Sequence, residues 1–291
     1  MKSKPKVLLL YKNSTYASYF LSGKSRLKEL RGISHHSEIG RFKETHEYHF
    51  RSLSHVERTL KSRNLSYTKV RRGDPVDYRR YYFVITVGGD GTFLEAARGI
   101  KNSLILGVNS DPAWSVGNFC AARAQNFEKV LDDVLTGGPT IRYYQRIMLT
   151  FPKGFTKAVH VLNDILICHS NPAAISRYYL TIGKAKEEQR SSGIWISTAV
   201  GSSGAIHSAG GRLLQPQSKK IQYRPRELYL WKNAHYTLKG GVVTLNKPLV
   251  VTSFMREGVV FVDGSHHKIP FPFGCSIKIT QSPYPLKVVW S

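Results

Sequence analysis

A lone carboxylate, Asp90, lies among glycines in the segment VITVGGDGTFLE, which covers residues 84–95. The apolar residues predict a buried strand, and GGDG predicts a turn. The spacing of Thr92 and Glu95 predicts a capping box with a helix that begins at Thr92. Glycines let a ligand approach the main chain, and the unpaired N–H groups of a helix N-terminus favour anions. We therefore expect a phosphate-binding turn in which Asp90 accepts a proton from a hydroxyl or helps to hold a metal ion.

A second strand end favours this chemistry over the plainer alternative, an ordinary Asp-Gly β-turn. Residues 104–112 read LILGVNSDP and predict a short apolar strand that ends in polar residues, and SVGNF follows at residues 115–119. Ligands of open parallel sheets bind beyond the carboxyl ends of the strands, so we expect the two strand ends to face one crevice. The candidate binding residues in this half of the chain are Gly88, Gly89, Gly91, Thr92 and Asn118.

Two polar patterns elsewhere suit a nucleotide. Lys12 follows the predicted first strand, Val7–Tyr11, where its ammonium group either meets a donor phosphate or is simply solvated. Asn163 and Asp164 place an amide beside a carboxylate, and together these groups can accept from and donate to the hydroxyls of a ribose. The alternative for this pair is a β-turn.

A run of small and hydroxyl-bearing residues, SSGIWISTAVGSSGAIHSAGG, covers residues 191–211. Side chains with so little bulk allow a planar base or a pyrophosphate to approach the main chain. The alternative is a linker, but the apolar IWI at residues 194–196 favours a packed element. The candidate binding residues of this run are Ser192, Thr198, Gly201, Ser203, Gly204 and Ser208.

These motifs together resemble those of the NAD kinase family. The matching segments are GGDGT, GVNSDP, LNDI at residues 162–165, PAAISRYYL at 172–180 and the serine-rich run, in the family's order over residues from about 84 to 211. GGDGT by itself is shared with diacylglycerol and sphingosine kinases, and a related form occurs in phosphofructokinases. The later segments point to NAD kinase, and PAAISRYYL is similar to a segment of the mitochondrial and plant-type branches.

The resemblance implies a two-part fold and a reaction. The fold is an α/β N-terminal Rossmann-like domain followed by an all-β C-terminal domain, with the active site between them. The reaction is the ATP-dependent phosphorylation of the adenosine 2′-hydroxyl of NAD to give NADP, with Mg²⁺ brought by ATP. In the family, the residue that matches Asp90 contacts this hydroxyl as base or orienting group, and those that match Asn163 and Asp164 contact a ribose of the dinucleotide. The family is usually dimeric or tetrameric through its β domains, so we expect a homo-oligomer.

The chain departs from the family's pattern at two places. Many members carry an acid where this chain has Ser192, and Thr-Ala-Tyr where it has Ser203-Gly204-Ala205. The loss of the acid and of the aromatic ring suggests a more open site, or one that accepts NADH as well as NAD. Asp164 replaces a glutamate that is more common in the family, which is a conservative change. ATP and polyphosphate remain alternatives for the phosphoryl donor.

The composition is compatible with an anionic partner. The 291 residues include 43 Lys and Arg against 19 Asp and Glu, a net charge of +24, and 41% are hydrophobic. The hydrophobic content indicates a globular chain, and the charge suits nucleotides, polyphosphate or nucleic acid, although a generally basic surface is the alternative. A lipid kinase of the same superfamily and a non-catalytic nucleic-acid-binding protein are therefore competing hypotheses. The lipid kinase would need a hydrophobic pocket and a membrane-facing surface, whereas the polar pair at residues 163–164 suits a dinucleotide.

Neither the cysteines nor the histidines predict a metal centre. Cys120, Cys168 and Cys275 make neither a disulfide framework nor a metal-ligand spacing, so we expect a reducing, cytoplasmic location. No apolar stretch is as long as a membrane span, and the N-terminus reads as a strand and not as a signal peptide. His46 and His49 are expected on the solvent-exposed face of a helix.

The elements that must position these residues change in kind near residue 140. Before it, strands are predicted at residues 7–11, 67–71, 83–87 and 104–109, and helices at 44–63, 93–100 and 127–135. After it short strands predominate, among them residues 141–151, 158–167 and 194–197, which predicts a sandwich or closed sheet. We therefore expect an α/β domain over residues 1–139 and a β-rich domain over 140–291, with the segment 270–291 a candidate to pack back on the first domain.

Overall fold

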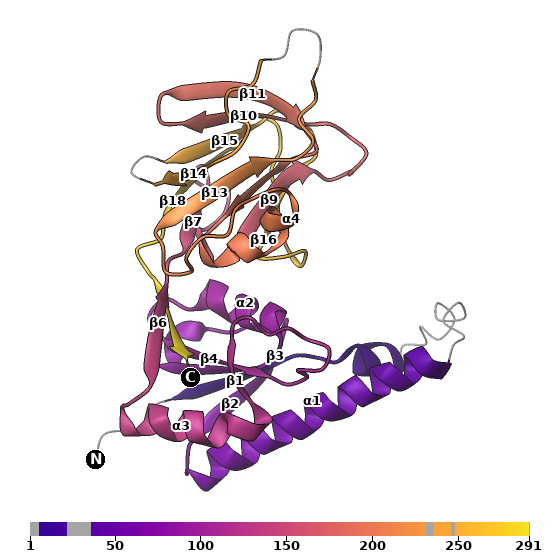
Figure 1. Ribbon diagram of the computed structural model, residues 1–291, viewed down its shortest axis with the longest axis vertical. Coiled ribbons are helices and arrows are strands. Elements are labelled where there is room, and N and C mark those ends of the chain that lie inside the picture. The colour runs from indigo at the N-terminus through magenta and orange to yellow at the C-terminus, as the bar shows by residue number, and fades with distance from the viewer. Residues whose placement is uncertain (1–5, 22–35, 231–234, 246–247, 291) are drawn as a thin grey trace. The chain divides into compact units, whose positions relative to one another are not determined.

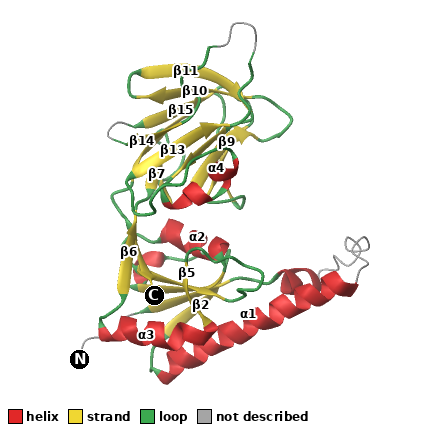
Figure 2. Ribbon diagram, in the orientation of Figure 1, coloured by secondary structure: helices red, strands yellow, loops and turns green. Residues whose placement is uncertain are grey.

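The computed structural model describes residues 6–21, 36–230, 235–245 and 248–290 of the chain. By their contacts the residues form two compact units, the first comprising residues 1–142 with 287–291 and the second residues 143–286. Figure 1 labels the elements, and Figure 2 shows that the long helices belong to the first unit, whereas the second consists mainly of strands. The predicted fold class, an α/β domain followed by an all-β domain, is confirmed.

A seven-stranded sheet forms the centre of the first unit, in the order β2-β1-β3-β4-β19-β6 with β5 beside β4. β1 pairs in parallel with β2 and β3, and β3 pairs in parallel with β4. The chain runs from β1 to β2 on one side and then to β3 on the other, which makes the switch point where open α/β sheets bind ligands. The strands are β1 (Val7–Tyr11), β2 (Tyr67–Arg71), β3 (Phe83–Gly88), β4 (Leu104–Asn109), β5 (Cys120–Arg123), β6 (Thr140–Tyr144) and β19 (Leu286–Trp290).

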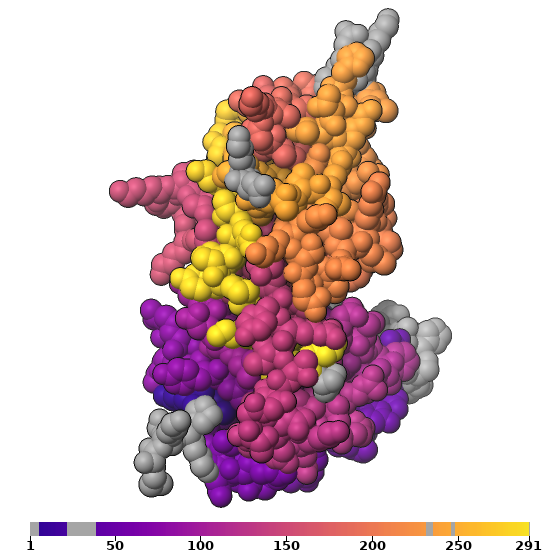
Figure 3. All heavy atoms as spheres, turned by 60° about the vertical axis from the view of Figure 1, so that its left-hand side comes forward, coloured from indigo at the N-terminus to yellow at the C-terminus, as the bar shows by residue number. Residues whose placement is uncertain are grey.

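Two strands share the second edge of β4. Its residues Leu104 and Ile105 pair with β19, whereas Gly107, Val108 and Asn109 pair with β5. Figure 3 shows atoms of the C-terminal segment, in yellow, among the magenta atoms of the first unit. Because β5 adjoins only the carboxyl end of β4, the loop between them, residues 110–119, lies at the ligand-binding edge of the sheet.

Helices cover both faces of this sheet (Figure 1), with α1 and α3 on one face and α2 on the other. They are α1 (His36–Ser62), α2 (Asp90–Gly99) and α3 (Phe127–Thr136), with the short helices η1 (Ala17–Leu21), η3 (Tyr78–Arg80) and η4 (Ala124–Asn126). α1 is amphipathic, because Leu53, Val56 and Leu60 recur at helical spacing and are buried against apolar residues of the strands. This spacing predicted the helix, which begins at His36, before the predicted start.

Two six-stranded sheets form the second unit, in the orders β11-β10-β15-β18-β7-β8 and β14-β13-β12-β9-β16-β17. All the pairings given for them are antiparallel, and their inner faces share one core, to which Ile147 and Tyr178 contribute from the first sheet and Ile165 and Ile194 from the second. Side chains alternate along a strand, so Asp164 on β9 faces away from the core that Ile165 enters.

The strands of the first of these sheets are β7 (Ile147–Thr150), β8 (Val159–Val161), β10 (Ser176–Ile182), β11 (Ala185–Ser191), β15 (Leu249–Ser253) and β18 (Ser276–Gln281). Those of the second are β9 (Asp164–His169), β12 (Ile194–Ser197), β13 (Lys220–Pro225), β14 (Gly241–Thr244), β16 (Gly258–Val262) and β17 (His267–Pro270). Two short helices, η5 (Val200–Ser203) and α4 (Ala205–Ser208), follow β12.

Two predicted strands are each split in the structure. Residues 141–151 form β6 and β7, and residues 158–167 form β8 and β9, with the two members of each pair in different sheets. The first break holds Arg146, whose buried guanidinium donates from Nε to the Tyr284 carbonyl at 2.8 Å. The second break carries the Asn163 main chain. An apolar run does not by itself distinguish one strand from two, so only the packing reveals these breaks.

In the part of the chain that the structure describes, no helix is both long and apolar enough to span a membrane.

Candidate functional site

The carboxyl ends of β1, β3 and β4 are joined to one another by main-chain hydrogen bonds. Lys12 N donates to Val87 O at 3.0 Å, and Ser110 N donates to Gly88 O at 3.1 Å. Three polar segments that are far apart in the sequence therefore meet at one edge of the sheet. This edge includes the switch point between β1 and β3, so it is where the first unit presents a binding surface.

Asp90 is held at this edge as the first residue of α2. Its Oδ1 accepts from Phe119 N at 2.9 Å and its Oδ2 from Asn118 N at 3.1 Å. Each carboxylate oxygen keeps a further lone pair, because such an oxygen can accept two hydrogen bonds. Asn118 is exposed and contributes its main chain to Asp90. The carboxylate is thus oriented by the protein and still able to accept a substrate proton.

The glycine turn before α2 leaves almost no room for side chains. A Cβ at Gly88 would collide with Thr92 Oγ1, and one at Gly89 would collide with Ser115 Oγ. Thr92 itself is buried, so its hydroxyl lies against the turn and not at the surface. Gly91 is exposed. The glycines therefore let the turn pack closely against its neighbours and leave its outer side to main-chain atoms.

The predicted capping box is wrong. α2 begins at Asp90 with Gly89 as its N-cap, and no side chain caps it. Glu95 does not reach back to this end, because its carboxylate accepts from Gly73 N at 2.7 Å and from Arg72 Nε at 3.1 Å. These partners follow β2, so Glu95 ties the β2 end to α2. The N-terminal N–H groups of α2 are consequently not occupied by a capping side chain, which suits an anion site.

Asn109 arranges the loop that reaches Asp90, and the sequence did not single out its role. Its Nδ2 donates to Ser115 O at 2.9 Å, and its Oδ1 accepts from Asp111 N at 3.1 Å. Gly117 then lies against the Asn109 amide with φ of 64°, a left-handed conformation that favours glycine. The loop is folded so that residues 118–119 present their N–H groups to Asp90.

The expectation that His49 lies on an exposed helix face is wrong. His49 is 0% exposed, and its Nδ1 lies 2.9 Å from Ser110 Oγ. Burial, followed by the nearby positive charge of Lys12, lowers the pKa of His49 to about 3, so the imidazole is neutral. His46 is half-buried, with Nδ1 2.6 Å from Ser14 Oγ. The face of α1 with these histidines packs on the loops that follow β1 and β4.

Lys12 lies half-buried at the same edge, close enough to Asp111 for their charges to interact. Burial lowers the pKa of Lys12, and the Asp111 carboxylate opposes that shift. Asp111 is 2% exposed, and burial raises its pKa against the effect of Lys12. A cation that is partly desolvated interacts more strongly with an incoming phosphate than a fully solvated one does.

A second cluster of the predicted residues lies in the second unit, around Asn163. The main-chain carbonyl of Asn163 accepts from Thr198 N at 3.0 Å and from Ser197 Oγ at 3.2 Å. The side-chain Nδ2 of Asn163 donates to Asp164 Oδ2 at 3.2 Å. A Cβ at Gly201 would collide with Asn163 O, and one at Gly204 would lie 3.3 Å from Asn163 Nδ2. The structure thus brings the amide, the carboxylate and the glycine-rich turn together.

Asp164 is a buried acid whose pKa is raised. It is 4% exposed, and burial, followed by the negative charge of Asp263, raises its pKa to about 7. It also borders a largely apolar cavity of about 220 Å³ on the outer side of its sheet. The other residues that line this cavity are Leu166, Trp195, Phe261, Gly264 and Ser265.

Three predicted residues lie at the margin of this cluster or outside it. Ser203 and Ser208 are exposed at the ends of η5 and α4. Ser192 precedes β12, while Ser197 at the other end of β12 pairs with Asp164. At about 3.3 Å per residue, the five residue steps from Ser192 to Ser197 span about 16 Å, so Ser192 lies apart from the cluster.

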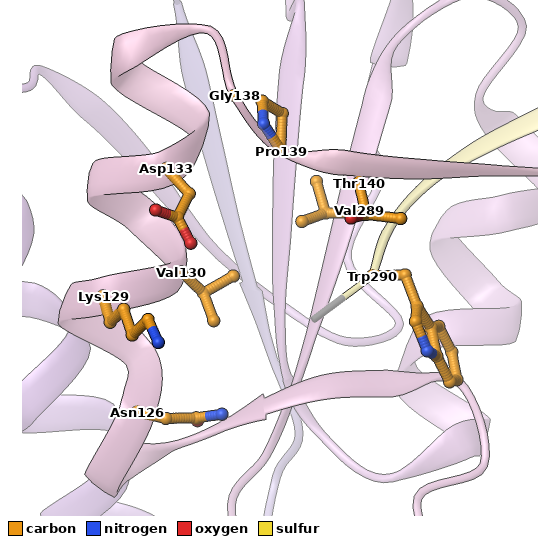
Figure 4. Close-up of a pocket in the computed structure, with 9 residues that line it drawn as sticks. All are labelled: Asn126, Lys129, Val130, Asp133, Gly138, Pro139, Thr140, Val289 and Trp290. Atoms are coloured by element: carbon orange, nitrogen blue, oxygen red, sulfur yellow. The ribbon is translucent and has the colours of Figure 1, made fainter.

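Another cavity, of about 350 Å³, lies in the first unit between α3 and the strands β6 and β19 (Figure 4). The residues that line it are Asn126, Lys129, Val130, Asp133, Gly138, Pro139, Thr140, Val289 and Trp290. None of them belongs to the predicted site. Among the residues with defined positions, no group of three His, Cys, Asp or Glu side chains could hold a metal ion.

Comparison with known proteins gives a consistent result. A family model described as the ATP-NAD kinase N-terminal domain matches residues 33–138. The chain is 32% identical to a probable NADH kinase of Oryza sativa subsp. japonica, over 83% of this chain and 81% of that protein. It is also 32% identical to an NADH kinase of Arabidopsis thaliana, over 84% of each chain. The solved structure of an NAD kinase from Archaeoglobus fulgidus in complex with ATP has the same fold, with a TM-score of 0.69, 21% identity, and coverage of 98% of this chain and 93% of that one.

Proposed function

We propose, because this chain belongs to the NAD kinase family, that it transfers the γ-phosphoryl group of ATP to the 2′-hydroxyl of the adenosine ribose of NAD or NADH. The observation that carries this proposal is the Asp90 carboxylate, held by two main-chain N–H groups beside a glycine turn and a helix N-terminus. Phosphoryl transfer to a hydroxyl needs a held donor, an aligned acceptor and a group that takes the proton. Asp90 supplies the last of these and orients the hydroxyl.

The remaining roles follow from the chemistry of each group. The N–H groups at Gly89 and Gly91, with the dipole of α2, suit phosphate oxygens. The Lys12 ammonium at the end of β1 suits a donor phosphate. In the second unit, the Asn163 amide and the Asp164 carboxylate suit the hydroxyls of a ribose. Both substrates are anionic, which accords with a net charge of +24.

Mg²⁺ enters this proposal with ATP. A magnesium ion bound to a nucleotide keeps several waters and needs only one or two protein carboxylates, so the described residues need not form a ligand cluster. Asp90 fits such a role, since a lone pair on each oxygen is not taken by the main chain. The bound ion would neutralise part of the phosphate charge.

The acceptor could be NAD, NADH or both, and one comparison favours NADH. The relatives from rice and Arabidopsis are named as a probable NADH kinase and an NADH kinase. The chain also carries Ser192 where many members of the family have an acid. The loss of this acid is compatible with a site that accepts NADH as well as NAD, since NADH lacks the positive charge of the oxidised nicotinamide ring.

The deciding experiment incubates the purified chain with ATP and Mg²⁺ and either NAD or NADH, and measures NADP or NADPH. We expect product with at least one dinucleotide. Sphingosine and diacylglycerol serve as parallel acceptors, and labelled lipid without labelled dinucleotide would contradict the proposal. Replacement of ATP by polyphosphate in the same assay identifies the donor.

The surroundings of the enzyme form a separate proposal. We infer that the chain forms a homo-oligomer, because members of the family usually do. We also infer that it is located in a reducing compartment such as the cytoplasm. The cysteines support the compartment, because Cys120, Cys168 and Cys275 are free. Light scattering on the purified protein measures the oligomeric state, and fractionation of cells that express the tagged chain locates it.

A further inference from the structure

The second unit holds a buried pair of carboxylates, Asp164 and Asp263, which are 4% and 7% exposed. Asp263 N donates to Asp164 O at 2.9 Å. The Asp263 carboxylate in turn accepts from Asn163 N at 2.6 Å and from Leu162 N at 3.3 Å. Residue 263, directly after β16, thus holds the start of β9 through both its main chain and its side chain.

The backbone of Asp263 is adapted to this contact. Its φ is 48°, in the left-handed region that side-chain-bearing residues other than Asn and Asp rarely adopt. In this conformation the side chain turns back to the N–H groups of residues 162 and 163. A short carboxylate or amide is therefore the kind of side chain that this position accepts.

The charge of Asp263 acts on two buried groups. Arg146 is 1% exposed; burial lowers its pKa to about 10, and the Asp263 carboxylate opposes that shift. The negative charge of Asp263 also raises the pKa of Asp164 beyond what burial alone would do. Ser197 of β12 and the turn at Gly201 and Gly204 also pack against the Asn163–Asp164 segment but bring no charge. Among the residues with defined positions, Asp263 is thus the charge that acts on Asp164.

We propose that Asp263 is a positioning residue of the dinucleotide site, which fixes the main chain at Leu162 and Asn163 through one hydrogen bond from each N–H group and acts on Asp164 through its own negative charge. The inference rests on the proposed function, which assigns Asn163 and Asp164 to a ribose. An ionised Asp164 accepts from two ribose hydroxyls, whereas the protonated acid has one oxygen that donates. Binding of the dinucleotide therefore strengthens as the pH rises through about 7.

The test compares wild type with Asp263→Asn. Asparagine tolerates the left-handed backbone, and its amide oxygen can still accept from Asn163 N, so the variant removes the charge together with the acceptor for Leu162 N. Two readouts are measured from pH 5.5 to 8.5: the ¹³Cγ shift of Asp164 without ligand, and the dissociation constant for NADH by calorimetry. Asp164→Asn identifies the NMR signal and removes the titrating group.

In wild type we expect the Asp164 signal to titrate near pH 7, and NADH affinity to rise about tenfold between pH 6 and pH 8. In Asp263→Asn the midpoint falls toward the value that burial alone gives, and the rise in affinity between pH 6 and pH 8 is smaller than in wild type. In Asp164→Asn the affinity no longer depends on pH in this range. The matched control is Glu227→Gln, which removes an exposed charge from another residue with positive φ, 40°, and should change neither readout.

The outcomes separate this inference from the proposed function. An Asp164 midpoint below pH 5 in wild type, or the same midpoint in wild type and Asp263→Asn, overturns the inference even if the enzyme phosphorylates NADH. A titration that shifts as expected, in a protein that neither binds nor phosphorylates NAD or NADH, contradicts the proposed function and with it the role of Asp263 in a ribose site.

Discussion

Both oxygens of the Asp90 carboxylate are held by main-chain N–H groups, which fixes its direction without a neutralising cation. If Asp90 is the base that we propose, a carboxylate held in this way loses little conformational freedom when the substrate hydroxyl binds, which lowers the entropic cost of alignment. The donors, Asn118 and Phe119, depend in turn on the fold of the loop around Asn109. The reactivity of one carboxylate therefore depends on a loop of about ten residues.

Asp90→Asn is expected to lower kcat by about two to four orders of magnitude while the KM values change far less. The amide oxygen can replace one acceptor, but the amide cannot take the proton of the hydroxyl. Asp133→Asn, an exposed acid on α3, is the matched control and should leave kcat unchanged. Steady-state kinetics with NAD and NADH measure both. A kcat near that of wild type would show that Asp90 is neither base nor orienting group.

Asn163→Ala is expected to weaken binding of the dinucleotide and to leave the fold in place. The variant keeps the main-chain hydrogen bonds to Asp263 and Thr198 and loses only the amide. A hydrogen bond between neutral groups, such as this amide and a ribose hydroxyl, is worth about 0.5–1.5 kcal/mol, which corresponds to about 2- to 13-fold in affinity. Calorimetric titration with NADH measures the loss, and an unchanged dissociation constant would place the amide outside the site.

Residue types and spacing predicted Asp90, the glycine turn and the Asn163–Asp164 pair as candidates, because each is a local pattern with an evident chemical use. The contributions of Asn109, His49 and Asp263 were not predicted. Each acts through contacts with segments distant in the sequence, such as Asp263 with residues 162–163 and His49 with Ser110. A polar residue at the end of a strand is a local signal that marks both Asn109 and Asp263, and no local pattern marks His49.

At the scale of the elements, the neutral His49 connects α1 to the loop after β4, at the binding edge of the sheet. His49 has a pKa of about 3 in the folded state, against 6.5 for an ordinary histidine. Between these two values the unfolded chain binds a proton that the folded chain does not. Folding stability contributed by this site is therefore fully present above pH 6.5 and is lost as the pH falls toward 3.

We therefore expect the free energy of unfolding to fall by at most about 5 kcal/mol between pH 6.5 and pH 3 through His49, with a shallower slope in His49→Phe. His55→Gln is the matched control, because His55 lies on the same helix with 29% of its side chain exposed. Calorimetric unfolding across this pH range measures the slopes. The absolute stability of His49→Phe is not the readout, since the variant also loses its contact with Ser110. Equal slopes in wild type and His49→Phe would contradict the assignment.

The turn between β12 and α4 makes a second prediction at this scale. A Cβ at Gly201 would collide with the main chain of Asn163, which is itself fixed by Asp263, so neither side can yield easily. Gly201→Ala should cost about 1–3 kcal/mol of stability and weaken NADH binding at least tenfold. Gly138→Ala is the control, because nothing lies within 4 Å of a Cβ there. Thermal unfolding and calorimetric titration decide the point, and a silent Gly201→Ala would show that the turn can move.

Several strands have the bounds that the sequence predicted, namely β1, β2, β4 and β12. It did not predict β11, which reads AKEEQRS. That strand is at a sheet edge and is held by main-chain pairing with β10, so its side chains need not be apolar. An apolar pattern thus indicates a buried strand, and an edge strand such as β11 can lack this pattern because main-chain pairing holds it.

At the scale of the whole molecule, the excess of positive charge is too large to be neutralised internally. The 19 acidic residues cannot pair with 43 Lys and Arg, and several acids are already committed, such as Asp132 to Arg63 and Glu57 to Lys69. One interpretation is that the excess cations create a field that attracts anionic substrates from a distance. The alternative is that this charge only keeps the protein soluble, and the two readings differ in how salt acts.

If the field steers the substrates, the apparent second-order rate constant falls several-fold between about 0.05 M and about 0.5 M salt, because the screening length drops from over 10 Å to about 4 Å. The rate of the chemical step at saturating substrate should change far less, so kcat in the same titration is the internal control.

Single-stranded RNA and polyphosphate then serve as competitors against ATP. Competition that fades with salt would show a polyanion surface and make polyphosphate a credible donor, because a chain of phosphates meets the same cations as a nucleotide. A flat salt profile without competition would contradict steering and leave the kinase reaction to depend on short-range contacts alone.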